Sequence, residues 1–268
     1  MMILASPSPL GVALGLGTAA AYAVSAATAS WLGRNATRSW LVVAWVLHAL
    51  ALGHGLIGSD PHFGFAPALS VTAWLVLTVY GIESRLFPEL PVRRVLAVLG
   101  AAVALLAVLF AGTSLHVAAS PWLALHLALG IASYGLFGVA VVHAWLMTRA
   151  EKQIRLAAGP QGGVPLLTLE RLTFSFVMAG FVLLSATLLA GLLFGEKLYG
   201  AGRPLKWDHK TVFSVLAWLS FAVLLMGRAR FGWRGRTARR MLYAGAALLL
   251  LAYVGSRFVL EVLLARTS

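Results

Sequence analysis

Long apolar stretches, separated by short polar segments, recur along the whole chain. Each has the length of about 20 residues that an α-helix needs to cross the hydrocarbon core of a bilayer. The backbone in a bilayer has to satisfy its own hydrogen bonds, so such stretches are helical. The pattern predicts an all-α polytopic membrane protein with eight transmembrane helices, at about 10–31, 39–57, 66–83, 92–112, 121–147, 172–194, 210–227 and 241–264.

The composition of the chain agrees with this class. The chain is 60% apolar and only 11% charged, whereas soluble domains have roughly 25% charged residues. No charged residue precedes Arg34, so the first stretch lacks the basic start of a secretory signal and is interpreted as a retained helix. The sequence has no cysteine, which excludes disulfides and thiolate chemistry. We expect residues 1–268 to form a single integral membrane domain.

Basic residues are unevenly divided between the loops. Fifteen of the 21 Lys and Arg residues fall on alternate loops. Loops rich in Lys and Arg stay in the cytoplasm, so this side is predicted to be cytoplasmic, with both termini outside. The fifteen are Arg34, Arg38, Arg85, Arg93, Arg94, Arg149, Lys152, Arg155, Arg171, Arg228, Arg230, Arg234, Arg236, Arg239 and Arg240.

The net charge of +13 follows largely from this topology. In a soluble protein such a charge would suggest nucleic-acid binding, but here the lipid bilayer supplies anionic partners. We therefore expect no nucleic acid as a partner. The arginine-rich segment 228–240 is interpreted as a lipid anchor, and docking of a membrane or cytosolic protein there is the alternative.

Polar residues within the bilayer are costly and therefore point to sites. The sequence has no phosphate-binding glycine loop, no metalloprotease histidine pair and no nucleophile elbow, which favours a protein that is not an enzyme. Among the histidines, His48 and His54 are about 600° apart in helical rotation, so we do not expect them to share a face. His126 and His143 lie roughly 25 Å apart along one helix, so they cannot serve one site.

A single buried histidine usually forms a hydrogen bond to a neighbouring helix, and this is our interpretation of His143. His126 is a better candidate for a ligand site. Gly130 and Ser133 follow it at i+4 and i+7, which gives a face open enough for a bulky planar ligand. For His48, both interpretations stay open.

Polar chemistry is most concentrated in the segment KWDHK, residues 206–210, directly before an apolar stretch. One interpretation is a simple helix start, in which Asp208 caps the helix. The other is an outward-facing shelf, in which Trp207 stacks on a flat ligand and Asp208 holds the turn that presents it. Both interpretations stay open.

Three segments resemble the cytochrome c assembly family of haem-handling membrane proteins. The segment "WLALHLALGIASYGLFGVAVVHAWL" is similar to the family's helix with an outward haem-ligand histidine ahead of Ser-Tyr, and His126, Ser133 and Tyr134 match it. The segment "KWDHKTVFSVLAWLSFAVLLMGR" resembles the end of the tryptophan-rich segment and the helix after it, and "LLLLAYVGSRFVLEVLL" resembles the last helix. The resemblance is clearest over 70–264 and is greatest to the short YpjD- or HemX-like branch.

This resemblance implies a haem cofactor. In the family, indoles of the outward segment stack on the macrocycle, while histidines on flanking helices ligate the iron. Carried over to this chain, the resemblance implies His126 as an iron ligand and Trp207 and Asp208 as parts of the shelf. We add His48 as a second candidate iron ligand because of its predicted place in the bilayer.

The chain also departs from the family pattern. The tryptophan-rich segment retains only Trp207, and no histidine follows His209, so the second outward histidine of the family is absent. His209 replaces a proline and Met226 replaces a histidine; each is a candidate ligand, although packing is the alternative for Met226. Arg257 forms either an ion pair with Glu261 at i+4 or a clamp for the haem propionates.

Three functions follow from these observations. The first is a haem-binding membrane factor in cytochrome c assembly or haem handling, with a degenerate outward haem shelf, in the bacterial inner membrane. The second is an accessory or regulatory membrane subunit without haem transport, which acts on a partner enzyme or transporter. A third, transport of another small substrate, is disfavoured because inverted repeats and paired broken helices are not evident.

Overall fold

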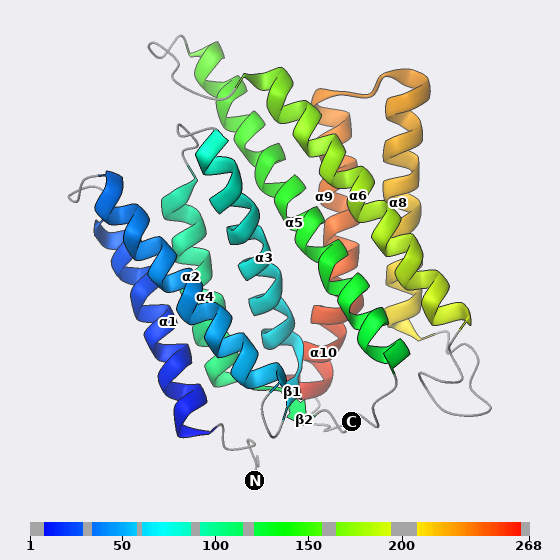
Figure 1. Ribbon diagram of the computed structural model, residues 1–268. Helices are drawn as coiled ribbons and strands as arrows, with labels where there is room; N and C mark the ends of the chain where they lie inside the picture. Colours follow the sequence, from blue (N-terminus) through cyan, green and yellow to red (C-terminus); the bar gives the residue numbers. More distant parts are fainter. Residues whose placement is uncertain are drawn as a thin grey trace. The chain divides into compact units, whose positions relative to one another are not determined.

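The computed structural model describes residues 8–28, 34–57, 61–86, 92–114, 121–156, 165–193 and 208–263. Nearly all of them are helical (Figure 1). In chain order the elements are α1 (Pro9–Ala27), α2 (Arg34–Ile57), β1 (His62–Phe63), α3 (Phe65–Leu86), α4 (Arg93–Leu109), β2 (Thr113–Ser114), α5 (Pro121–Arg155), α6 (Leu166–Leu193), α8 (His209–Phe231), α9 (Gly235–Leu250), η2 (Leu251–Gly255), α10 (Ser256–Phe258) and η3 (Val259–Leu263).

The predicted all-α membrane class is confirmed. Within the described residues, seven helices are long and apolar enough to cross a membrane, the last of them being α9 with its continuation to Phe258. The predicted stretch 92–112 corresponds to α4, which has 17 residues. Its length of about 25 Å is somewhat less than the roughly 30 Å of a hydrocarbon core.

Two helices extend beyond the apolar stretches that predicted them. The helix α5 has 35 residues and ends at Arg155, whereas its apolar stretch ends near residue 147. Its last turns contain Ala150, Glu151 and Lys152, and such residues favour helix without needing apolar surroundings. The helix α6 begins at Leu166 rather than at residue 172. Its first turns contain Glu170 and Arg171, which are compatible with a helix but interrupt the apolar stretch.

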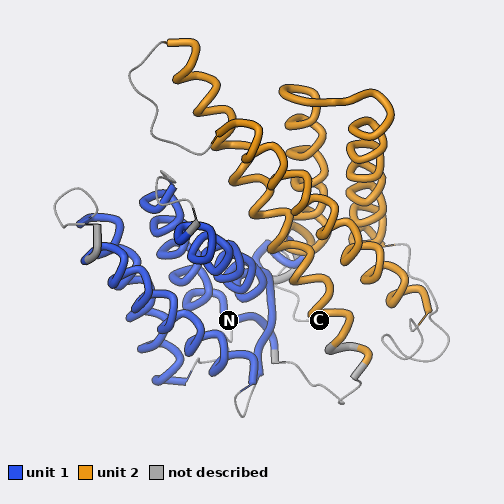
Figure 2. Tube along the Cα trace, turned by 45° about the horizontal axis from the view of Figure 1, so that its top comes forward, with its two compact units in different colours: residues 1–116, 257–268 blue, residues 117–256 orange. Residues whose placement is uncertain are grey.

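The chain forms two compact units (Figure 2). Unit 1 comprises residues 1–116 and 257–268, and unit 2 comprises residues 117–256. In unit 1, α1 packs against α2 and α4, and α3 packs against α4. In unit 2, α5 packs along α6, and α8 packs along α9. The single membrane domain expected for residues 1–268 stays a prediction.

One end of unit 1 is fixed by a short antiparallel strand pair. The strands β1 and β2 place His62 opposite Ser114 and Phe63 opposite Thr113. Gly112 precedes β2 with φ +85°, and a Cβ there would lie 2.6 Å from the carbonyl group of Phe63. Glycine is therefore required at this turn, since a side chain would meet backbone. The pair joins the α2–α3 connection to the segment after α4.

The core of unit 2 forms where α5, α6, α8 and α9 pack together. Phe137 of α5 and Phe221 of α8 stack with ring centroids 3.7 Å apart. Gly180 of α6 and Gly245 of α9 lie against these rings, because a Cβ would come within 3.1 Å of Phe137 and 2.8 Å of Phe221, respectively. Small residues at such contacts let membrane helices approach closely. This packing fixes the helix ends that carry the candidate site.

Candidate functional site

His126 lies near the start of α5 and is half-buried. Its ring packs beside Gly191 of α6, where a Cβ would lie 3.4 Å from the imidazole Cε1. Its Nδ1 atom is buried and forms no hydrogen bond of good geometry, and the ring interacts with the backbone of Thr187 in α6. Buried polar atoms nearly always form hydrogen bonds. An imidazole nitrogen that lacks a good one is therefore suited to bind a metal or a ligand.

The residues that follow His126 fix the helix in place. Ser133 is buried, and its hydroxyl donates to the carbonyl of Gly130 at 2.8 Å. The hydroxyl of Tyr134 donates to the carbonyl of Leu249 in α9. Tyr134 therefore ties α5 to α9 just before the π-helical stretch η2, a local irregularity that is frequent at functional sites.

The face after His126 is only partly open, since Gly130 is half-buried and Ser133 is buried. A Cβ on Gly130 would lie 3.6 Å from the Cγ2 of Thr187 in α6, and Ser133 has no exposed surface. The reason is that glycine and serine also allow close helix approach, and α6 uses that space. A ligand on α5 is thus restricted to the end of the helix near His126.

His48 is part of a buried hydrogen-bond network in unit 1. The histidine is 1% exposed. Its Nδ1 lies 3.2 Å from the Tyr22 hydroxyl of α1, and its Nε2 lies 2.8 Å from the Ser70 hydroxyl of α3. Both ring nitrogens are therefore engaged, and iron ligation by His48 would require one of these hydrogen bonds to break.

Three histidines line a cavity of about 260 Å³ at the strand-pair end of unit 1. They are His48, His54 and His62, and the Nε2 of His54 lies 2.7 Å from the Ser8 hydroxyl. Among the described residues, no group of three or more His, Asp or Glu side chains could hold a metal ion. The volume is slightly below the roughly 300–1,000 Å³ of typical ligand pockets, so the cavity suits only a small molecule.

His48 and His54 project from different sides of α2, as the rotation of about 600° between them predicts, but one cavity reaches both. Both line the same cavity, together with Ala51 and Gly55 between them. The lining residues cover roughly 200° of the circumference of α2, because α1, α3 and α4 all leave space around this helix end. Helical rotation alone does not show how far a cavity extends around a helix.

The remaining sequence candidates differ in their surroundings. His143 is 2% exposed and meets the ring of Phe176 edge-on, with ring centroids 5.4 Å apart; the hydrogen bond to a neighbouring helix that we expected of it stays a prediction. Met226 is 57% exposed. His209 is the first residue of α8 and is exposed. Arg257 is half-buried in α10, and the side chain of its expected partner Glu261 lies outside the described residues.

Asp208 forms the N-cap of α8. Its Oδ1 accepts hydrogen bonds from the backbone N–H of Thr211 at 3.0 Å and from the Thr211 hydroxyl at 3.1 Å. This is the geometry of the helix-start interpretation. Trp207 lies outside the described residues, so its place in a shelf stays a prediction.

Within unit 2, the fold brings several candidates to one end. The start of α5, the end of α6 and the start of α8 lie at the same end of this helix bundle (Figure 1). His126, Asp208 and His209 therefore share that end. Met226 lies 17 residues further along α8 than His209, about 25 Å away by helical rise. His48 and Arg257 belong to unit 1.

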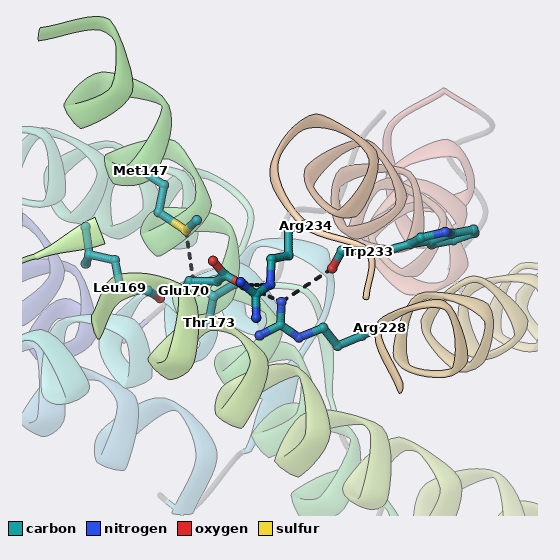
Figure 3. A network of polar contacts seen from close by, with 7 residues as sticks. All are labelled: Met147, Leu169, Glu170, Thr173, Arg228, Trp233 and Arg234. Atoms are coloured by element: carbon teal, nitrogen blue, oxygen red, sulfur yellow. Dashed lines mark hydrogen bonds and ion pairs between the residues drawn. The ribbon is translucent and has the colours of Figure 1, made fainter. Parts of the chain in front are cut away.

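The opposite end of unit 2 carries an ion-pair network that the sequence did not reveal. Glu170 of α6 pairs with Arg228 and also with Arg234, whose Nε lies 3.3 Å away (Figure 3). Glu151 of α5 accepts two hydrogen bonds from Arg239, at 2.5 Å and 3.0 Å. Three arginines of the segment 228–240 thus pair with acidic side chains of the protein itself. The chain has only eight acidic residues, and two of them, Glu151 and Glu170, lie on either side of the loop between α5 and α6. Two acidic residues on the side richest in arginine could have predicted ion pairs there.

Comparison with known proteins identifies the family. Residues 34–264 match the family model of the cytochrome C assembly protein. The chain belongs to this family. The match covers both units and extends the resemblance noted from residue 70 onwards toward the N-terminus.

Individual relatives agree with this assignment. The chain is 30% identical over 231 residues to the inner membrane protein YpjD of Escherichia coli, which covers 83% of this chain and 85% of that protein. It is 36% identical over 146 residues to an uncharacterized 28.8 kDa protein of Azospirillum brasilense, about 53% of each chain. It is 26% identical over 162 residues to the cytochrome c biogenesis protein CcsA of Prochlorococcus marinus, 52% of each chain. No solved structure matches the chain significantly.

The predicted location is confirmed by these findings. The YpjD relative is an inner membrane protein, and the described residues contain seven helices able to cross a membrane. The protein is therefore a multi-pass inner-membrane member of the cytochrome c assembly family, on its YpjD-like branch.

Proposed function

We propose that the protein is a haem-binding membrane factor that acts in cytochrome c assembly or haem handling. Family membership and the CcsA relative support the process. The observation that carries the haem proposal is the half-buried His126 at one end of unit 2, whose buried Nδ1 forms no hydrogen bond of good geometry. His126 is also the residue that matches the haem-ligand histidine of the family.

The residues at this end of unit 2 fit a haem. His126 would hold the iron, and the bound haem would supply one-electron chemistry whose potential depends on the axial ligand. Tyr134 would keep α5 in position through its hydrogen bond to Leu249. Asp208 would present the turn before α8, with Trp207 as the proposed stacking surface. His209 is exposed at the same end and is the nearest candidate on α8 for a second ligand.

We further propose that α4 is an eighth membrane span and that both termini lie outside. Eight spans and the uneven distribution of Lys and Arg support each other, because an even number returns the chain to the same side. With this orientation the end of unit 2 that carries His126 faces outward. The arginine-rich turn between α8 and α9 then faces the cytoplasm.

The proposal is tested by the absorption spectrum of the detergent-purified protein. We expect a Soret band in the oxidised state and sharpened α and β bands after reduction, at close to one haem per chain. A well-folded protein that takes up no haem, either from cells or after addition of hemin, would contradict haem binding.

The alternative is an accessory or regulatory membrane subunit without haem transport. It is favoured by the small set of available ligands, since His48 engages both ring nitrogens and Met226 lies far from His126 along the bundle. A folded protein without a haem spectrum that crosslinks to one membrane enzyme or transporter in cells would support this alternative. A folded protein with neither a haem spectrum nor a crosslinked partner would contradict both proposed functions.

A further inference from the structure

The arginine-rich end of unit 2 contains a groove of about 670 Å³. It lies along the first turns of α6 and is bounded by the end of α8 and the turn before α9. This volume is within the roughly 300–1,000 Å³ of typical ligand pockets. The groove plays no part in the proposed haem function, because His126 lies at the other end of the same helix bundle.

The groove has a charged part and an apolar part. Arg171, Arg228 and Arg234 face a single acidic residue, Glu170, in the charged part, which leaves a net charge of about +2. Further along α6 the lining is apolar, and it includes Met178, which is 50% exposed. A molecule with an anionic head and an apolar tail matches both parts.

The charged part is held in place before any ligand binds. The guanidinium of Arg228 pairs with Glu170 and lies 4.4 Å from the ring centre of Phe174. It also donates to the carbonyl of Trp233 at 3.5 Å. The indole of Trp233 covers Gly227, where a Cβ would lie 2.3 Å from the ring, so the turn is closely packed. Such preorganisation lowers the entropic cost of binding.

Two arginines keep donors available for an anion. The side chain of Arg234 is 64% exposed, and the pairing with Glu170 involves its Nε. A guanidinium has five N–H donors, so most of the donors of Arg234 remain for a second partner. Arg171 lines the groove and is exposed. Phosphate oxygens are well matched by such planar donor groups.

We propose that this groove binds one anionic phospholipid, with its phosphate on Arg171 and Arg234 and an acyl chain along Phe174 and Met178. The excess positive charge selects an anionic headgroup over a zwitterionic one. Residues 171 to 178 span about 10 Å of helix, which is about two thirds of the roughly 15 Å of hydrocarbon in one leaflet. A lipid is favoured over an acidic protein because the apolar part runs along a membrane-spanning helix.

The test measures lipid binding to the full-length protein in detergent by native mass spectrometry. Phosphatidylglycerol and phosphatidylcholine are titrated into the wild type, into the groove variant Arg171→Gln/Arg234→Gln, and into the control Arg236→Gln/Arg240→Gln. The control removes the same charge from exposed arginines of α9 that do not line the groove. Each arginine is expected to contribute about fivefold in affinity. The groove variant, which lacks two, should therefore bind phosphatidylglycerol about twenty-fivefold more weakly, and the control should resemble the wild type.

A second variant tests the apolar part without changing charge. Ala179 is exposed in the groove, so Ala179→Trp should fill it without disturbing the core. We expect this variant to weaken phosphatidylglycerol binding at least fivefold, while glycerol phosphate, which has no acyl chain, binds poorly to every protein. Equal losses in the groove variant and the control would overturn the proposal. Binding of glycerol phosphate as tight as that of the lipid would also overturn it, in favour of a site for soluble anions.

Discussion

At the residue scale, several polar side chains of the helices form hydrogen bonds that join neighbouring helices. His48 connects α1 and α3 through Tyr22 and Ser70. Trp45 of α2 does the same with α3, since its indole N–H donates to the hydroxyl of Thr78 at 2.8 Å. In a hydrocarbon medium such hydrogen bonds favour one arrangement of helices over others. The residues that could bind a ligand are therefore those whose polar atoms take no part in these hydrogen bonds.

The His48 network yields a stability prediction. Ser70→Ala removes the partner of the buried Nε2 of His48, and we expect a loss of about 1 kcal/mol in unfolding free energy. The matched control is Ser84→Ala on the same helix, where the hydroxyl donates only to the carbonyl of Gly81 at 3.0 Å. Unfolding in SDS measures both variants. Equal stability of the two would show that the His48 network contributes nothing.

The capping geometry of Asp208 yields a second prediction. Asp208→Ala removes the acceptor for Thr211 and should cost about 1 kcal/mol, whereas Asp208→Asn keeps an acceptor and should be mild. Thermal unfolding in detergent compares them. If the asparagine variant is as unstable as the alanine variant, the negative charge matters more than the cap. Trp207→Leu addresses the shelf separately, since it should reduce haem retention without changing stability.

At this scale, the sequence of a single helix predicts its caps and its apolar faces but not which neighbouring helix packs against it. The cap at Asp208 was one of two interpretations that the sequence left open, and the burial of His143 was expected, because each depends on nearby sequence or on a place in an apolar stretch. The contact of α6 near Gly130 and the cavity shared by His48 and His54 were not predicted. Both depend on which neighbouring helix comes close, and a periodicity within one helix carries no such information.

At the scale of elements, apolar stretches located the helices but not their ends. The stretches mark where the chain needs a hydrocarbon environment, and α5 continues as a helix for about two turns past that point. The π-helical stretches η2 and η3 had no signal in the apolar pattern either. A shift in backbone hydrogen bonding leaves hydrophobicity unchanged, so only the structure reveals it.

The orientation of these elements is open to a direct test. We predict that reporter fusions at Gly162 and Gly235 give a cytoplasmic signal and that a fusion at Gly202 gives an external one. The reason is the concentration of Lys and Arg residues on alternate loops. Alkaline phosphatase and green fluorescent protein fusions report the two sides. A cytoplasmic signal at Gly202 would place the His126 end inside and remove the basis for an outward haem site.

At the scale of the whole molecule, the two ends of unit 2 differ in chemistry. One end has His126, Asp208 and His209, and the other has the pairs formed by Glu151 and Glu170 with arginines. The sequence indicated the membrane class, the family and the charge asymmetry, because these are spread over many residues. It did not indicate which arginines are neutralised internally, because those pairs join residues 58 and 88 positions apart.

The central claim is that His126 binds haem iron. The most direct measurement is the absorption spectrum of three purified proteins: the wild type, His126→Ala and His143→Ala. The two histidines lie on one helix, about 25 Å apart, so the second variant controls for loss of a buried imidazole. We predict that His126→Ala abolishes or shifts the Soret band in a protein that remains folded, while His143→Ala retains the wild-type band. Equal spectra for the wild type and a folded His126→Ala protein, or equal losses in both variants, would contradict the assignment of His126 as the ligand.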